Sequence, residues 1–216
     1  IREVIQQHNP DLIGISSMTA TFPAACQLVK ICREIRPDIG IVLGGRHPSA
    51  LPELSLEQSG ADFVVIGDGE ETFCELIKNL KKPQCVDGIA FRSHAGSIIT
   101  NNPRIKNSQI DSLPIPVVES SLSRYGFEDG QAGDLFTWSL LSARGCPFQC
   151  VYCATDHQVR FRSLENVMTE IRTVKAKYGI THFCFEDDTF SLKRDRMEQM
   201  CHALAAEKVK WTCVTR

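Results

Sequence analysis

Three short apolar runs alternate with amphipathic segments near the start of the chain, and this alternation constrains the fold most. The runs are DLIGISS (11–17), IGIVLGG (39–45) and DFVVIGDG (62–69). Pro23 opens a segment with apolar residues at helical spacing, and further helices are expected at 53–58 and 70–80. Strands that are apolar on both faces and separated by helices are typical of parallel sheets covered on both sides. The sequence therefore predicts an α/β domain over residues 1–92.

Small polar loops follow each predicted strand, at 16–21, 44–48 and 67–70. Ligands of parallel sheets bind beyond the carboxyl ends of the strands, and glycine allows a ligand to approach the backbone closely. Glycine also simply makes turns, and this explanation suffices for any single loop. Three such loops on one rim favour a large ligand lying across them. The loops contain neither a P-loop lysine nor a G-x-G-x-x-G motif, which disfavours a nucleotide.

Residues 93–131 are expected to form a connection without chemistry of its own. GIAFRSHAGSIITNNP predicts two short strands around a turn, and Pro103, Pro114 and Pro116 then favour an extended linker.

Residues 132–216 alternate strands and helices again. Strands are predicted at 135–144, 181–188 and 211–216. A first helix runs from Ser163 to a cap at Gly179, and a second begins with a capping box of Asp195 and Glu198. The apolar face of the second helix consists of Met197, Met200, Cys201 and Leu204. This order is that of the first half of a β/α barrel, whose sites lie at the carboxyl ends of the strands.

Three of the ten cysteines stand close together among Gly and Pro: Cys146, Cys150 and Cys153. Thiolates at these spacings can converge on one metal centre, and three of them leave one iron of a [4Fe–4S] cluster free. Zinc is the alternative, with His157 as a fourth ligand. Five other cysteines lie in apolar segments and are expected to be structural: Cys26, Cys32, Cys74, Cys184 and Cys201.

Composition excludes several classes of protein. Lys and Arg number 24 against 26 Asp and Glu, so no strong field favours nucleic acid. We expect no membrane span and no signal peptide. The ten cysteines do not resemble a secreted disulfide scaffold, which favours a reducing, cytoplasmic location. A helix-like start at Ile1 and a strand-like end lead us to expect a piece of a longer protein.

The loops of the first domain resemble those of the cobalamin-binding domain, a flavodoxin-like fold, over about 85 residues. The resemblance implies that the loops hold the nucleotide tail of cobalamin through Ser16, Ser17, Thr19, Thr21, Gly44, Gly45, Gly67 and Gly69. The family's Asp-x-His-x-x-Gly, whose His can ligate cobalt, does not occur in this sequence. His47 is expected to be an ordinary polar loop residue.

Cys-x-x-x-Cys-x-x-Cys at the end of a first barrel strand resembles the radical S-adenosylmethionine superfamily. The resemblance implies that the three cysteines hold [4Fe–4S] and that the free iron binds S-adenosylmethionine. Tyr152 would lie near the adenine, and an acidic motif at Glu186, Asp187 and Asp188 near the methionyl amino group. FEDDTF departs from the family's usual Gly-Gly-Glu, which leaves open which acid makes the contact. Arg216 is expected to face the same cofactor.

Together the two halves are similar to cobalamin-dependent radical S-adenosylmethionine enzymes. Such enzymes imply reductive cleavage of S-adenosylmethionine to a 5′-deoxyadenosyl radical, oxygen sensitivity, a small-molecule substrate and a reductant such as flavodoxin or ferredoxin. Methyl transfer to an unactivated carbon is the expected outcome, and ring-forming relatives exist. One alternative is a ligand-binding sensor with a structural zinc loop. Another is an electron-transfer protein, which would need four cysteines per cluster.

Overall fold

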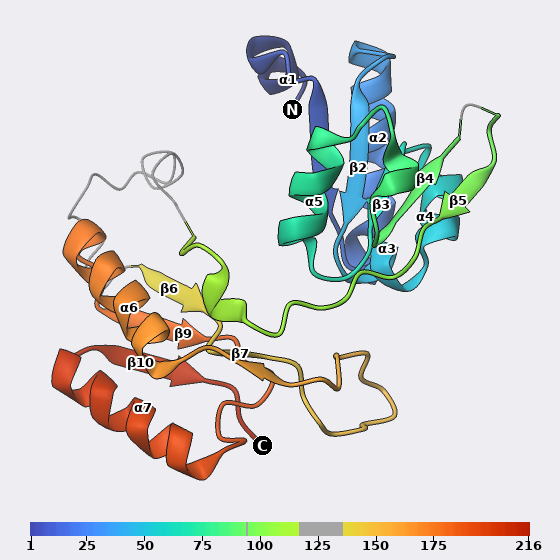
Figure 1. The fold of residues 1–216 in the computed structure, drawn as a ribbon. Helices are drawn as coiled ribbons and strands as arrows, with labels where there is room; N and C mark the ends of the chain where they lie inside the picture. The colour runs from blue at the N-terminus through green and yellow to red at the C-terminus, as the bar shows by residue number, and fades with distance from the viewer. Residues whose placement is uncertain (94, 117–135) are drawn as a thin grey trace. The chain divides into compact units, whose positions relative to one another are not determined.

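The computed structural model describes residues 1–93, 95–116 and 136–216. Two compact units divide the chain, Ile1–Lys106 and Asn107–Arg216. Each unit has its own sheet and its own apolar core, so each is described by itself below (Figure 1).

A five-stranded sheet in the order β1-β2-β3-β4-β5 forms the centre of the first unit. β1 (Leu12–Ser16), β2 (Gly40–Gly44) and β3 (Phe63–Val65) are parallel. β4 (Ile89–Arg92) and β5 (Ile98–Thr100) continue the sheet as an antiparallel hairpin. The carboxyl ends of the three parallel strands therefore share one rim, as the sequence predicts.

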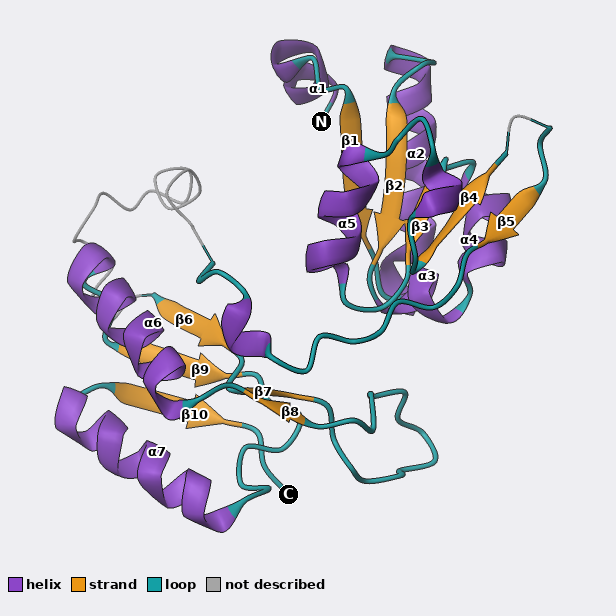
Figure 2. Cartoon of the chain, in the orientation of Figure 1, coloured by secondary structure: helices purple, strands orange, loops and turns teal. Residues whose placement is uncertain are grey.

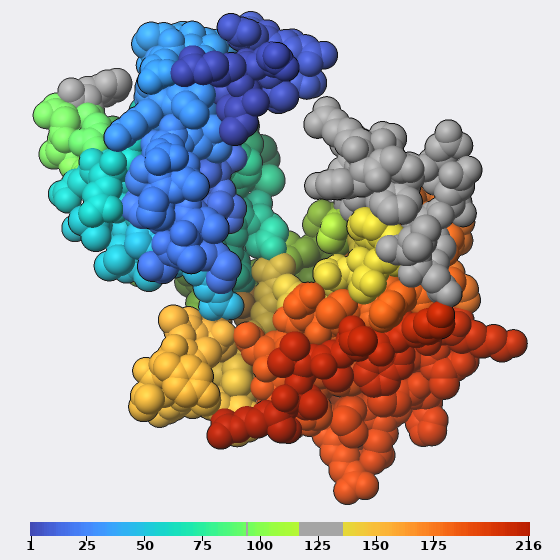
Figure 3. All heavy atoms as spheres, turned by 180° about the vertical axis from the view of Figure 1, so that it is seen from behind, coloured from blue at the N-terminus to red at the C-terminus, as the bar shows by residue number. Residues whose placement is uncertain are grey.

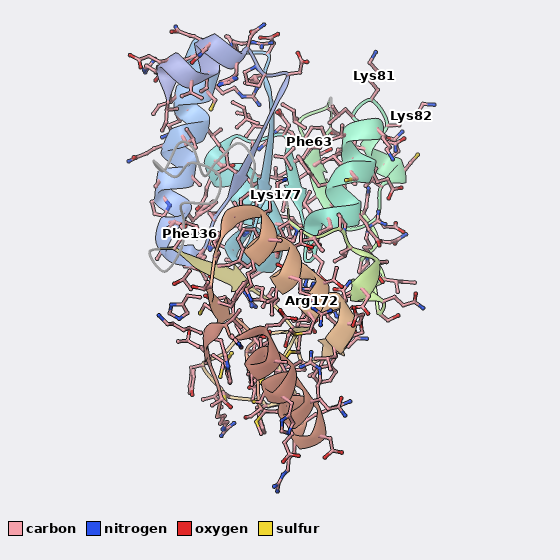
Figure 4. The ribbon with its side chains drawn as sticks, turned by 90° about the vertical axis from the view of Figure 1, so that its left-hand side faces the viewer. Phe63, Lys81, Lys82, Phe136, Arg172 and Lys177 are labelled. Atoms are coloured by element: carbon pink, nitrogen blue, oxygen red, sulfur yellow. The ribbon has the colours of Figure 1, made fainter. Side chains whose placement is uncertain are left out.

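Helices cover both faces of this sheet. They are α1 (Arg2–His8), α2 (Phe22–Ile35), α3 (Arg46–Ala50), α4 (Pro52–Ser59) and α5 (Gly69–Lys78), with single 3-10 turns at Thr19–Thr21 and Pro83–Cys85. Val29 and Cys32 of α2 pack with Leu56 of α4 against one face. Leu76 of α5 packs with Val42 and Val65 on the other. Lys81 and Lys82 extend outward just beyond α5 (Figure 4).

Two expectations for the first unit need correction. The segment 44–48 is not wholly a loop, because Arg46–Ala50 forms the short helix α3. The hairpin expected within the linker instead pairs with β3, and the first unit runs to Lys106 rather than 92. Backbone pairing explains the second difference: without the hairpin, β3 would be an edge strand with unpaired N–H and C=O groups.

The second unit contains a parallel sheet in the order β10-β9-β6. Its strands are β6 (Thr137–Leu140), β9 (His182–Phe185) and β10 (Lys210–Cys213), and its helices are α6 (Leu164–Tyr178) and α7 (Arg194–Glu207). A 3-10 turn lies at Ile110–Ser112. Both helices lie alongside the strands (Figure 2). Phe183 and Phe185 of β9 are fully buried among apolar side chains of α6 and α7.

The predicted strand 135–144 is interrupted, and its first residue lies outside the described residues. β6 ends at Leu140, and Ala143–Arg144 forms a separate strand β7 that pairs antiparallel with β8 (Arg160–Phe161). Ser163 caps α6 by accepting from the N–H of Asn166, and Gly179 ends the helix with a φ of 70°, both as predicted. The capping box of Asp195 and Glu198 is wrong, because α7 begins at Arg194 and the cap position is Lys193.

Candidate functional site

The loop that carries the three cysteines, here called the cysteine loop, comprises residues 145–159 between β7 and β8. Pairing of Ala143 with Phe161 and of Arg144 with Arg160 closes its base. Gly145 begins the loop with a φ of 90°, and a Cβ there would lie 2.5 Å from the Gln158 carbonyl oxygen. Only glycine combines this φ with so close a backbone approach. The loop runs outward from β7 and β8, beyond the arrowheads of β6, β9 and β10 (Figure 2).

The cysteine thiols of this loop are unpaired and accessible. Cys146 and Cys150 are partly buried and Cys153 is exposed. Cys146 Sγ lies 3.6 Å from Thr189 Oγ1, and Arg216 Nη1 donates to Cys150 Sγ at 3.8 Å. The Arg216 guanidinium also lies 4.5 Å from the centre of the Phe148 ring, and Figure 3 shows the end of the chain beside the loop.

No three His, Cys, Asp or Glu side chains gather around a common metal position in the described part of the chain. The sequence-predicted ligands therefore share one short loop without converging on a point. Their chemistry fits an iron–sulfur cluster, since three free thiols are the ligands that such a cluster takes, and metal binding itself orders a ligand loop. His157, the fourth ligand of the zinc alternative, is exposed, with Nδ1 3.3 Å from the Cys146 carbonyl oxygen.

The acidic motif after β9 places its three carboxylates in three different settings. Glu186 is exposed and accepts a hydrogen bond from Ser139 Oγ at 3.2 Å. Asp187 is only 2% exposed and accepts from the backbone N–H of Ser142 at 2.6 Å and of Ala143 at 3.1 Å. Asp188 accepts from Thr155 Oγ1 at 3.0 Å. Of the three acids, Glu186 and Asp188 are exposed and Asp187 is buried.

One predicted contact residue, Tyr152, and one residue that was not predicted, Arg196, also belong to the second unit. Tyr152 is 89% exposed on the cysteine loop, so its ring is open to a partner. Arg196, which the sequence analysis did not single out, donates to the Ser142 carbonyl oxygen at 2.9 Å. Burial lowers the pKa of the Arg196 guanidinium, and the Asp187 carboxylate acts in the opposite direction. The sequence carries no signal for this contact, because residues 142 and 196 are joined only by the fold.

A hollow of about 830 Å³ lies at the N-terminal ends of α6 and α7, and three arginines line it. Arg162 pairs with Glu170, Arg194 pairs with Glu198, and Arg196 binds Ser142. Each of the three arginines therefore already binds another group of the protein.

In the first unit, hydrogen bonds connect the three predicted ligand loops. The N–H of Ser17 donates to the Gly44 carbonyl at 2.9 Å, and that of His47 donates to the Ser17 carbonyl at 3.3 Å. Ser49 Oγ accepts from the N–H of Gly67 at 2.9 Å. The loops after β1, β2 and β3 thus form one continuous rim. Of the remaining predicted residues there, Ser16, Thr19 and Thr21 are exposed and Gly69 begins α5.

Two buried polar atoms at this rim lack a hydrogen-bond partner among the described residues. They are Ser17 Oγ and His47 Nε2. The His47 ring packs on Phe22 with 4.1 Å between ring centres, and its Nδ1 lies 3.2 Å from Thr19 Oγ1. Burying an unpaired polar atom is unfavourable, so a hydrogen bond from a bound group would stabilise either of these two atoms. His47, which the sequence predicts to be a polar loop residue, lies in the short helix α3.

The two glycines after β2 have different surroundings. A Cβ on Gly44 would meet no atom within 4 Å, whereas a Cβ on Gly45 would lie 2.6 Å from the Ser17 carbonyl oxygen. Gly45 also has a φ of 92°. Gly45 is thus needed for the close contact between two loops, and Gly44 leaves open space above the rim. A large ligand such as cobalamin fits this combination of open space and unpaired polar atoms.

The cysteines predicted to be structural are not all buried. Cys32 is buried, and burial raises the pKa of its thiol and of the Cys26 thiol. Cys184 and Cys201 are partly buried. Cys74 is exposed, so the prediction that it packs as a small apolar side chain is wrong. Its position faces away from the sheet because Leu76 and Thr72 supply the buried face of α5.

The arrangement defines a class of protein: an α/β ligand-binding unit on the same chain as a parallel α/β unit with a three-cysteine loop. Two family models match these parts, the B12 binding domain over residues 1–77 and the Radical SAM superfamily over residues 140–216. The chain thus carries, in this order, a match to the B12 binding domain and a match to the Radical SAM superfamily. These two matches bear out the predicted cofactors, which are cobalamin, [4Fe–4S] and S-adenosylmethionine.

Curated relatives match nearly the whole chain. An uncharacterized methyltransferase of Pyrococcus horikoshii is 31% identical over 100% of this chain and 48% of its own length. The anaerobic magnesium-protoporphyrin IX monomethyl ester cyclase of Synechocystis sp. is 29% identical over 99% of this chain and 44% of its own length. The chain thus spans about half the length of these relatives.

Solved structures share the fold. Apo OxsB, a cobalamin-dependent S-adenosylmethionine radical enzyme, is 25% identical with a TM-score of 0.74, covering 100% of this chain and 32% of OxsB. OxsB with aqua-cobalamin and S-adenosylmethionine bound gives a TM-score of 0.76 at 21% identity, covering 98% of this chain and 31% of OxsB. In the described residues, no helix is both long and apolar enough to cross a bilayer.

Proposed function

We propose that the protein is an enzyme that cleaves S-adenosylmethionine reductively and couples this step to cobalamin-dependent methyl transfer onto an unactivated carbon of a small molecule. When bound, the cluster supplies the electron that yields a 5′-deoxyadenosyl radical, and cobalamin supplies the methyl group. The observation that carries the proposal is the three free thiols on one loop beside the ends of β6 and β9.

The second unit would hold the cluster and S-adenosylmethionine. Cys146, Cys150 and Cys153 are the proposed cluster ligands. Glu186 is the proposed contact to the methionyl amino group, because its carboxylate is exposed and lies one residue beyond β9. Tyr152 would pack against the adenine with its exposed ring. A reductant such as flavodoxin or ferredoxin would supply the electron.

The first unit would bind the nucleotide tail of cobalamin along its rim. Ser17 Oγ and His47 Nε2 are buried and lack a partner among the described residues, so both can bind polar groups of the tail. The open space at Gly44 lets a bulky ligand approach the backbone. Ser16, Thr19, Thr21, Gly45, Gly67 and Gly69 complete the proposed binding surface.

Cyclisation is the second candidate reaction, and the Synechocystis relative, which is named a cyclase, favours it. The Pyrococcus relative is named a methyltransferase, and its identity to this chain is slightly higher. Methyl transfer is therefore proposed first. Product analysis distinguishes the two, because only methyl transfer moves a labelled carbon from S-adenosylmethionine to the substrate.

Anaerobic reconstitution of the intact protein with iron and sulfide tests the proposal. We expect about four irons per chain, reductive formation of 5′-deoxyadenosine after addition of dithionite, and stoichiometric binding of hydroxocobalamin. Cys146→Ala should lose the iron and keep cobalamin binding, since the two sites lie in different units. Stoichiometric zinc without iron uptake would instead support the sensor with a structural metal loop.

A further inference from the structure

Three consecutive residues after β9 each contact a different part of the cysteine loop or its base. Asp187 binds the base at Ser142 and Ala143, Asp188 binds Thr155 beyond the last cysteine, and Thr189 lies against the sulfur of the first cysteine. We propose that Asp187, Asp188 and Thr189, here called the loop clamp, are positioning residues that fix the cysteine loop against β9, and that Thr189 donates a hydrogen bond to the Cys146 thiolate.

Asp187 accepts three hydrogen bonds, and all of them come from Ser142 or Ala143 at the break between β6 and β7. Its Oδ1 accepts from the backbone N–H groups of Ser142 and Ala143, and its Oδ2 accepts from Ser142 Oγ at 2.5 Å. Hydrogen bonds to a carboxylate are stronger than those between neutral groups. The Arg196 guanidinium, on α7, binds both Ser142 Oγ and the Ser142 carbonyl. Two charged side chains, Asp187 and Arg196, thus bind Ser142 at the break between β6 and β7.

Asp188 and Thr189 act farther along the loop. Asp188 accepts from Thr155 Oγ1 at 3.0 Å, which ties down the segment after Cys153. Thr189 is 8% exposed, and its Oγ1 lies 3.6 Å from Cys146 Sγ. A cluster-bound thiolate has no hydrogen to give, so the threonine hydroxyl becomes the donor in that contact. In the protein without metal the same hydroxyl donates to the Asp188 carbonyl at 2.7 Å.

In the resembled family's Gly-Gly-Glu, the second glycine falls at Asp187 and the glutamate at Asp188. A glycine at 187 would have no side chain to bind Ser142. Asp187 and Asp188 bind the base of the cysteine loop and the loop itself, whereas Glu186 is exposed one residue beyond β9 and binds Ser139. The proposal about the thiolate rests on the proposed function, whereas the contacts of Asp187 and Asp188 do not depend on any metal.

The first experiment measures the clamp in the protein without metal. Alkylation of each cysteine by iodoacetamide is followed by mass spectrometry, with buried Cys32 as an internal reference. Thr155→Val removes the hydroxyl that binds Asp188 and should speed alkylation of the partly buried Cys146 about fivefold, the effect of losing one ordinary hydrogen bond. The Cys146 N–H donates to the carbonyl of Asp156, next to Thr155, so the two segments are linked. Thr173→Val, an exposed change on α6 whose hydroxyl binds only Thr169, is the matched control and should leave the rate unchanged. Equal rates in Thr155→Val and the parent would overturn the clamp.

The second experiment measures the reduction potential of the reconstituted cluster by a redox titration. A hydrogen bond to a ligand sulfur favours the more negative, reduced cluster, so Thr189→Val should shift the potential to a more negative value. Thr189→Ser keeps the hydroxyl and should restore the parent potential. An unchanged potential in Thr189→Val with full iron content contradicts the proposed donor. A parent protein that takes up no iron contradicts the proposed function instead, and the alkylation rates still decide the clamp.

Discussion

Arg162 and Glu170 form an ion pair inside the second unit, with 2.6 Å between Arg162 Nη1 and Glu170 Oε2. The carboxylate is 1% exposed, and its other oxygen accepts from Trp138 Nε1 at 2.9 Å. Oε2 receives no well-aligned hydrogen bond from the described residues, so charge rather than hydrogen-bond geometry holds this contact. A buried carboxylate without its cation is strongly unfavourable.

Arg162→Met should therefore lower the free energy of unfolding by about 3–5 kcal/mol. The double variant Arg162→Met, Glu170→Gln removes the unpaired charge and should recover part of this loss. Arg172→Met is the control, because Arg172 lies on the exposed side of α6, as Figure 4 shows. Its effect should stay within about 0.5–1 kcal/mol. Denaturant unfolding measures all three, and equal stabilities of Arg162→Met and Arg172→Met would contradict this account.

Gly44→Val and Gly45→Val should have different consequences. A valine at 44 enters open space, so the fold should survive while hydroxocobalamin binds about tenfold more weakly, since overpacking costs about 1–3 kcal/mol. A valine at 45 combines a φ of 92° with a Cβ at 2.6 Å from the Ser17 carbonyl oxygen, so it should lower the melting temperature as well. Absorbance titration and thermal unfolding separate the two effects. Parent-like cobalamin affinity in Gly44→Val would remove this glycine from the binding surface.

His157 distinguishes the two metal hypotheses. His157→Ala should leave the iron content of the reconstituted protein unchanged, because a [4Fe–4S] cluster takes its ligands from the three cysteines. In a zinc site the same change would remove one of four ligands and lower metal affinity. Metal analysis of His157→Ala beside Cys150→Ala provides the comparison. Loss of metal in both variants would favour zinc.

Glu186→Gln should weaken binding of S-adenosylmethionine about tenfold or more, because a charge-assisted hydrogen bond to the amino group is lost. Glu198→Gln, an exposed change on α7, is the matched control and should bind like the parent. Calorimetric titration of the reconstituted proteins measures both. If Glu186→Gln binds normally, another group contacts the amino group.

Periodic apolar patterns predicted the strands and helices well because each pattern reports which side of an element is buried. β1, β2 and α2 all lie where their patterns place them. The break after Leu140 was not predictable, since LFTWSLLSAR is continuously compatible with a strand. The break is stabilised by Asp187, a residue remote in sequence, and local patterns carry no information on such contacts.

The candidate site likewise combines features that local sequence patterns predict with features that only the fold creates. The cysteine spacing and the glycine loops are local signals, and they pointed to residues that the structure places at strand ends. The different roles of Glu186, Asp187 and Asp188 depend on which of them meets Ser142 or Thr155, and only the fold decides that. Residue type alone predicts a polar loop residue at His47, and no local pattern encodes its packing on Phe22 or the burial of its Nε2.

The antiparallel pairing of β7 with β8 has a consequence for how a metal centre is assembled. Pairing at Arg144 and Arg160 closes the loop before any ligand is bound. The chain entropy of bringing the ends of a flexible segment together, which grows with the logarithm of its length, is then spent during folding. Metal uptake needs to order only the short stretch between these strands. Cluster insertion can accordingly follow folding as a separate, late step, with the polypeptide already committed to its final topology.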